Sequence, residues 1–206
     1  MKLTNAIAGA ATACILATAA SAEEYRFANF TPPFHTINAS VIEVLQQAME
    51  EGTDGESTVR GYHGGELGAG PIEQYIRVVQ GVADLAWGLP GYTSSQFRKT
   101  MIAELPATFD LEDPGYEGIW AAYDDHLSGE FPGTKPVAIW TSEPNIFIMR
   151  GHEVRTPADL QGLKLRVAGA TSAEVLGALG ATPVQMPINQ VYNALQTGLI
   201  DGGQTA

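Results

Sequence analysis

The chain has 206 residues, with 11 lysines and arginines against 23 aspartates and glutamates, and its formal net charge is −12 at pH 7. A chain this acidic argues against binding to nucleic acid or to an anionic membrane surface, because both need a basic patch. A small anionic ligand remains compatible with it, since one local cluster of cations can outweigh the net field.

Residues 1–22 have the pattern of a secretory signal peptide: a lysine near the start, an apolar run, and the small-residue ending Ala20-Ser21-Ala22. Two glutamates follow at once, and no later segment is long enough to span a bilayer. We therefore expect export with cleavage after Ala22. The only cysteine, Cys14, lies inside this signal, so the exported chain would have no thiol for a disulfide or for catalysis.

From Glu24 onwards, strand-like and helix-like segments alternate along the chain. This alternation predicts an α/β fold with largely parallel sheets. The expected strands are 24–30, 57–63, 82–88, 135–141, 163–169 and 182–186, and the expected helices are 37–51, 70–81, 113–127, 156–162, 172–180 and 189–198.

Two of the expected helices have apolar residues at steps of three and four, which predicts one buried face on each helix. These residues are Ile37, Val41, Val44, Leu45, Ala48 and Met49 in the first helix, and Ile72, Tyr75, Ile76 and Val79 in the second.

One spacing occurs twice. Gly81 and Asp84 follow the helix 70–81 in the same way as Gly198 and Asp201 follow the helix 189–198. Two interpretations remain open from the pattern alone: an ordinary helix-to-strand turn that uses glycine, or two related α/β units in one chain.

The expected strand 163–169 carries an arginine near its carboxyl end. Leu165 and Val167 would share one face of the strand, and Lys164 and Arg166 the other. Ligands of open α/β sheets bind outside the carboxyl ends of the strands, where a guanidinium can offer a planar fork of N–H donors to a carboxylate. The alternative is an exposed arginine paired with a surface acid, which is worth only ~0–1 kcal/mol.

The residues that catalysis or metal binding would need are scattered. No pair of the four histidines has the spacing of metal ligands, and there is no H-E-x-x-H motif. The stretch 62–68, "YHGGELG", resembles half of a hydrolase oxyanion loop around His63, but a G-x-S-x-G nucleophile elbow is absent. A ligand-lining loop or a plain turn explains these glycines better.

Residues 156–202, "TPADLQGLKLRVAG…LGATPVQMPINQVYNALQTGLIDG", resemble the DctP-type solute receptors of tripartite ATP-independent periplasmic (TRAP) transporters. The upstream stretches "GGELG", "VVQGVADLAWGLPGYT" and "ELPATFD" resemble the same family. The resemblance implies a two-lobed α/β periplasmic solute-binding protein. Its first lobe would begin with residues 23–140 and its second with residues 141–206, and the fold would be incomplete at the C-terminus, with unpaired sheet edges.

What the resemblance implies for function is a periplasmic receptor that closes on an organic acid and delivers it to a TRAP permease in the membrane. Such a receptor needs no catalysis, cofactor or metal. The alternatives are the ligand-sensing periplasmic domain of a signalling system and, less in keeping with the sequence, a secreted hydrolase that uses His63.

In this resemblance, Arg166 matches the family's arginine that clamps the substrate carboxylate. Ile146 stands where many relatives have a second arginine, and Gln204 or Thr205 where they have a substrate-binding asparagine. Loss of the second cation favours a monocarboxylate with an apolar, aromatic or branched body over a sugar acid or a dicarboxylate. The residues expected to line the cleft with Arg166 are Phe34, His35, Glu66, Trp87, Gly88, Tyr92, Asn145, Phe147, Gln204 and Thr205.

Overall fold

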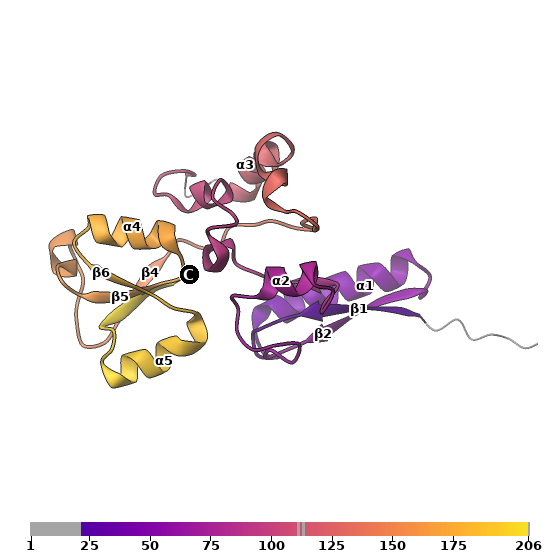
Figure 1. The fold of residues 1–206 in the computed structure, drawn as a ribbon, viewed down its shortest axis with the longest axis horizontal. Helices are drawn as coiled ribbons and strands as arrows, with labels where there is room; N and C mark the ends of the chain where they lie inside the picture. The colour runs from indigo at the N-terminus through magenta and orange to yellow at the C-terminus, as the bar shows by residue number, and fades with distance from the viewer. Residues whose placement is uncertain (1–21, 111, 113, 206) are drawn as a thin grey trace, which may run out of the picture.

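The structure, a computed structural model, describes residues 22–110, 112 and 114–205. Apart from Ala22, the predicted signal peptide and its Cys14 lie outside the described residues. Two sheets are built from separate stretches of the chain, and a set of short helices around α3 (Gly115–Ala122) lies between them in sequence (Figure 1). Within the described ranges, no helix is long and apolar enough to cross a membrane.

The first sheet is entirely parallel and has the strand order β2-β1-β3. The helices η1 and α1 pack on it: Ile42 of η1 clusters with Phe27 and Val59, and Leu45 and Met49 of α1 pack against this cluster. We call this part of the chain the first unit. Its elements are β1 (Glu23–Ala28), η1 (Asn38–Ile42), α1 (Glu43–Gly52), β2 (Ser57–Tyr62), α2 (Gln74–Val79) and β3 (Leu85–Ala86).

The second sheet has the order β4-β7-β5-β6, in which β5, β6 and β7 are parallel and β4 is an antiparallel edge strand. Helices α4 and α5 lie on opposite sides of this sheet (Figure 1). We call residues 164–205 the second unit. Its elements are β5 (Lys164–Val167), α4 (Ala170–Ala178), β6 (Thr182–Gln185), α5 (Ile188–Thr197) and β7 (Gly202–Thr205), with β4 (Ile146–Met149) added at the edge.

The two units follow the same path. In each, the first strand lies in the middle, the second strand pairs on one side and the third on the other. This order brings the chain back across the first strand, which creates a topological switch point at the carboxyl ends of β1 and β3 and of β5 and β7.

The repeated spacing marks the same turn in both units. Gly81 and Gly198 are both left-handed, with φ of 70° and 74°. The backbone N–H of Asp84 donates to the Arg26 carbonyl, and the Arg26 N–H donates to the Asp84 carboxylate, each at 2.8–2.9 Å. Asp201 makes the same pair of bonds with Lys164, both at 2.8 Å. The interpretation as two related units therefore holds in the structure.

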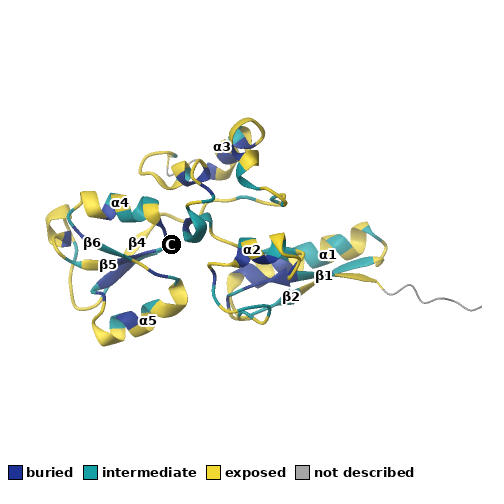
Figure 2. Cartoon of the chain, in the orientation of Figure 1, coloured by how far each residue is buried: buried dark blue, intermediate teal, exposed yellow. Residues whose placement is uncertain are grey.

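Two small hydrophobic cores stabilise the second unit, and Figure 2 shows its central strand as the most buried element. Leu165 and Val167 of β5 pack with Leu176 of α4 on one face. On the other face, Met186 and Ile200 pack with α5. Because side chains alternate along a strand, Arg166 lies on the α5 side of the sheet.

Between the units, the described residues from 89 to 163 form short helices and the edge strand β4. The N–H groups of Lys99 and Thr100 donate to the Glu130 carboxylate at 2.7 and 2.9 Å, and these bonds tie two of the helices together. The elements of this region are η2 (Pro90–Thr93), η3 (Thr100–Glu104), α3, η4 (Tyr123–Leu127), η5 (Ser128–Glu130), β4 and η6 (Pro157–Leu160). The predicted lobe boundary between residues 140 and 141 falls within this region and stays a prediction.

The α/β class and most elements agree with the sequence, but several details are wrong. Residues 135–141 form no strand: Pro136 lacks a backbone N–H and the segment pairs with neither sheet. Conversely, β4 and β7 were missed. Gly202 and Gly203 are weak strand formers, and they become a strand because β7 lies between β4 and β5.

The predicted faces of the two early helices are also partly wrong. Val44 of α1 is 57% exposed. In α2, Ile76 and Val79 face outward, whereas Gln74 and Arg77 are buried. The reason is local: the Arg77 guanidinium donates to the carbonyls of Ala69 and Gly70, so the polar face of this helix is used to hold a glycine-rich loop.

Candidate functional site

Arg166 occupies the centre of the second sheet, between Val184 of β6 and Gly203 of β7. Its side chain is only 4% exposed. A Cβ on Gly203 would lie 3.2 Å from the Cβ of Arg166, so glycine on the neighbouring strand makes room for the long side chain. The alternative of an exposed surface arginine is therefore wrong for this residue.

Three neutral groups hold the Arg166 guanidinium. Its Nε donates to the Met186 carbonyl at 3.0 Å, one terminal nitrogen to the Gln204 carbonyl at 3.2 Å, and the other to the Tyr92 hydroxyl at 2.9 Å. A guanidinium has five N–H groups, so one on each terminal nitrogen is left by these bonds. Among the described ion pairs, none joins a carboxylate to Arg166.

A buried charge without a counter-ion is costly, and the two remaining N–H groups match the two oxygens of one carboxylate. The electrostatics of this position therefore favour a bound anion. The site needs no metal or cofactor to attract one, because the guanidinium carries the charge itself.

Tyr92 comes to this site from η2, the short helix that follows β3 of the first unit. Its hydroxyl also accepts the N–H of Ile188, the first residue of α5, at 3.2 Å. This segment is seated closely, since a Cβ on Gly169 would lie 2.4 Å from the Gly91 carbonyl oxygen. Glu104 lies beside Gly91, and although this residue is exposed overall, burial of its carboxyl raises its pKa.

Aromatic rings gather at the carboxyl end of the first sheet. The rings of Phe30 and Trp87 stack with centroids 4.8 Å apart and planes 8° apart. The His35 ring lies 5.6 Å from Trp87. Phe30 was not among the predicted site residues, although an aromatic residue two positions beyond the end of β1 was a signal for it.

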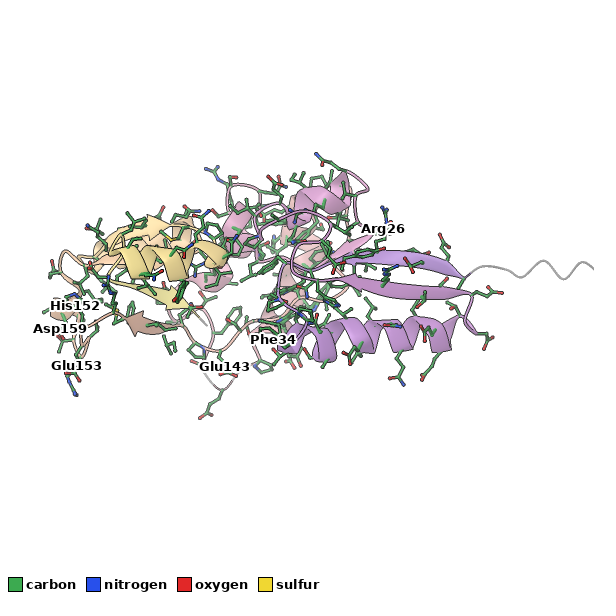
Figure 3. The ribbon with its side chains drawn as sticks, turned by 90° about the horizontal axis from the view of Figure 1, so that it is seen from below. Arg26, Phe34, Glu143, His152, Glu153 and Asp159 are labelled. Carbon is green, nitrogen blue, oxygen red and sulfur yellow. The ribbon has the colours of Figure 1, made fainter. Side chains whose placement is uncertain are left out.

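The loop that carries Phe34 and His35 is fixed by buried amides. Asn29 donates to the Asn38 side chain at 2.8 Å, and Asn38 donates to the Pro33 carbonyl at 2.6 Å. Phe34 itself is 90% exposed, and Figure 3 shows it at the end of the first unit that lies toward the second sheet. A rigid loop thus presents an unburied aromatic ring toward the region between the two sheets.

Glu66 is exposed on a turn after β2, Gly88 is exposed just after β3, and neither is described as contacting Arg166. The turn with Glu66 belongs to the glycine loop that Arg77 holds. His63 lies nearby, but its described hydrogen-bond partner is the Asn29 amide at 3.4 Å rather than a serine or a carboxylate. This geometry does not supply an activated nucleophile.

The remaining predicted residues lie on or beside the edge of the second sheet. Phe147 of β4 faces Gln204 of β7 in register, and Asn145 is exposed just before β4. Thr205 pairs with Ile146. The side-chain oxygen of Gln204 is buried, and no hydrogen-bond partner is described for it.

The structure thus brings the predicted residues into two groups. Arg166 contacts both Tyr92 and Gln204, and His35 and Trp87 form the other group with Phe30. A separate cavity of about 380 Å³ lies between η3 and α3 and shares no residue with either group. We place the candidate site at Arg166 because the lysine that lines the cavity, Lys99, is exposed and donates to the His126 carbonyl, whereas Arg166 is buried.

Comparison with known proteins identifies the family. A family profile described as "Bacterial extracellular solute-binding protein, family 7" (DctP) matches residues 27–205. The chain belongs to this family. The predicted DctP-type relationship is therefore confirmed, and so is the α/β fold of these solute-binding proteins.

Individual relatives agree with this assignment. A solute-binding protein from Chromohalobacter salexigens is 26% identical over 194 residues, which is 92% of this chain and 56% of that protein. A TRAP solute-binding protein from Rhodoferax ferrireducens, in complex with copurified benzoate, has a TM-score of 0.82 and 29% identity over 88% of this chain and 56% of its own.

A second solved structure, from a marine metagenome, is described as specific for aromatic acid ligands and contains 3-hydroxybenzoate. Its TM-score is 0.84 at 28% identity, over 90% of this chain and 58% of its own. The chain thus spans little more than half the length of the relatives that it matches.

Proposed function

We propose that this chain belongs to a periplasmic receptor that binds an organic acid and delivers it to a TRAP permease. The observation that carries the proposal is the buried Arg166 guanidinium, which has a spare N–H on each terminal nitrogen and no described carboxylate partner. A ligand carboxylate would neutralise this charge and accept both N–H groups.

We further propose that the acid is a monocarboxylate with an aromatic or branched body. Ile146 replaces the second cation that a dicarboxylate would use, and the nearby rings of Phe30, Trp87 and Phe147 offer apolar surface. The solved relatives that contain benzoate and 3-hydroxybenzoate support the same class.

The other parts of the proposal follow from the family. The mature receptor begins after Ala22, acts in the periplasm and carries out no catalysis, in keeping with the family model and with the solved solute-binding relatives. Closure around the acid would bring both groups of residues onto it by movement of the two units. The proposed lining residues besides Arg166, Trp87 and Phe147 are Phe34, His35, Glu66, Gly88, Tyr92, Asn145, Gln204 and Thr205.

The test is binding of benzoate to Arg166→Ala, measured by ligand-observed NMR, which detects weak affinities. Loss of a charge-assisted pair should cost about 1.5–3 kcal/mol, or roughly 10- to 100-fold in affinity. Arg155→Ala is the matched control, because Arg155 is exposed and pairs only with the neighbouring Glu153 at the surface.

Arg166→Lys separates charge from geometry. It keeps the cation but loses the fork, so an intermediate loss is expected. Benzoate binding that survives unchanged in Arg166→Ala would refute the anchor. Succinate bound more tightly than benzoate by the parent chain would refute the monocarboxylate class.

A further inference from the structure

The hydroxyl of Tyr92 accepts two hydrogen bonds at once. Arg166 donates to it at 2.9 Å and the backbone N–H of Ile188 at 3.2 Å. A phenolic oxygen has limited acceptor capacity and one hydrogen of its own. Both donors therefore occupy the acceptor side of the oxygen, and the phenolic hydrogen has to point away from them.

No described hydrogen bond gives that hydrogen an acceptor, and the buried side-chain oxygen of Gln204 is itself described without a partner. The hydrogen bonds described for the Tyr92 hydroxyl are the two that it accepts, and neither partner can take a proton from it. We propose that Tyr92 donates its phenolic hydrogen to the same carboxylate that Arg166 binds, and that it thereby selects deprotonated acids over neutral amides. This inference rests on the proposed function.

The position of Tyr92 is set by packing rather than by the hydrogen bonds alone. The guanidinium carbon of Arg166 lies 5.9 Å from the centre of the Tyr92 ring. The adjoining backbone of Gly91 approaches Gly169 so closely that no side chain fits between them. The phenol is therefore a fixed donor, and it does not have to be ordered when the ligand arrives.

The proposal gives the carboxylate three donors: one N–H from each terminal nitrogen of Arg166 and the Tyr92 O–H. A carboxylate has lone pairs for all three, because both its oxygens are acceptors. A carboxamide presents an NH₂ group in place of one oxygen, so it would set donor against donor. The combination predicts a strong preference for a carboxylate over the amide of the same shape.

The experiment measures benzoate and benzamide binding to the parent chain and to Tyr92→Phe by ligand-observed NMR. Loss of one hydrogen bond to a charged group should weaken benzoate binding roughly 10- to 100-fold. Benzamide binding should change by no more than about threefold, because it gains little from this donor. Tyr192→Phe is the matched control, since Tyr192 is 74% exposed on the same helix that Ile188 begins.

The outcomes are distinct. Tyr92→Phe that weakens both compounds by the same factor would show a structural lesion and overturn the inference. Benzoate binding to Tyr92→Phe that is unchanged or tighter than to the parent chain would also overturn the inference. The Tyr92 hydroxyl would then contribute nothing to benzoate affinity, or would compete with benzoate for Arg166. If Arg166→Ala loses benzoate while Tyr92→Phe keeps it, this inference fails and the proposed function stands. If the parent chain binds no carboxylic acid, both this inference and the proposed function are refuted.

Discussion

The two units share their strand order and their glycine turn, but their buried cations occupy different positions. In the first, Arg77 lies four residues before the turn glycine Gly81; in the second, Ala194 lies four residues before Gly198. The relation is reversed on the strands. Arg166 of β5 stands two residues after Lys164, where the first unit has Ala28 two residues after Arg26.

This reversal separates a cation that holds a loop, Arg77, from the cation that we propose binds the ligand, Arg166. Arg77 donates to two loop carbonyls and has Glu73 beside it, so its position is explained by the loop that it holds. Arg166 retains unused donors and has no described counter-ion. Function is to be sought where the second unit departs from the first, and burial of an arginine alone does not identify a site.

The strand ends differ as well. Trp87 and Gln204 both stand three residues after the repeated aspartate, Asp84 or Asp201. The first unit therefore provides an aromatic wall at the position where the second provides a polar group beside the guanidinium. A ligand with a carboxylate at one end and a ring at the other matches this division.

The largest effect should come from Arg77, the cation that holds a loop. Arg77→Ala removes a buried side chain and leaves the Ala69 and Gly70 carbonyls without their donors, so the free energy of unfolding should fall by about 2–4 kcal/mol. Urea unfolding followed by circular dichroism measures it. Ile76→Ala is the control, because Ile76 is 41% exposed and should change stability by about 0.5 kcal/mol or less. A larger loss of stability in Ile76→Ala than in Arg77→Ala would support the buried apolar face that hydropathy predicted for this helix.

A smaller effect should follow from crowding the contact between the units. In Gly169→Ala the new methyl group meets the Gly91 carbonyl oxygen, and overpacking of this kind costs about 1–3 kcal/mol. Because the shift would move Tyr92, benzoate affinity should fall together with thermal stability. Gly177→Ala in α4 meets open space and should be neutral or stabilising. If Gly169→Ala and Gly177→Ala had the same thermal stability and benzoate affinity, the segment that carries Gly91 and Tyr92 would not pack against Gly169 as the structure shows.

The smallest effect tests the repeated turn itself. Asp84→Asn weakens the hydrogen-bonded ion pair with the Arg26 side chain, whereas Asp201 is described as bonding only to the Lys164 backbone. The first substitution should cost about 0.5–1 kcal/mol of unfolding free energy and the second about half of that or less, since both groups are partly exposed. A larger loss at Asp201, by urea unfolding, would contradict the comparison.

The pH dependence of stability provides a second test of the ion pair between Arg26 and Asp84. Hydrogen bonds from the Arg26 side chain and backbone hold the pKa of the Asp84 carboxyl below its usual 3.8. A lowered pKa stabilises the fold fully above the unfolded value, and this contribution is lost as the pH falls through the folded value. The stability difference between the parent chain and Asp84→Asn should therefore persist at neutral pH and shrink below about pH 4.

Sequence reasoning was most successful where local pattern and tertiary environment agree. The strand of Leu165 and Val167 and the turn that ends in Gly162 formed as expected. It failed at α2, where hydropathy predicted an apolar buried face but a loop of glycines needed the Arg77 side chain. It also missed Phe30, whose partner Trp87 is far away in sequence.

By itself, the sequence determined the α/β class and the family and singled out Arg166 as the candidate anchor, because periodicity, turn glycines and a compound motif are local properties of the chain. Only the tertiary structure decided that Arg166 is buried without a described counter-ion, and that its donors meet the Tyr92 hydroxyl. Those facts depend on two segments more than seventy residues apart being packed together, with Gly91 against Gly169, and no local pattern encodes such a contact.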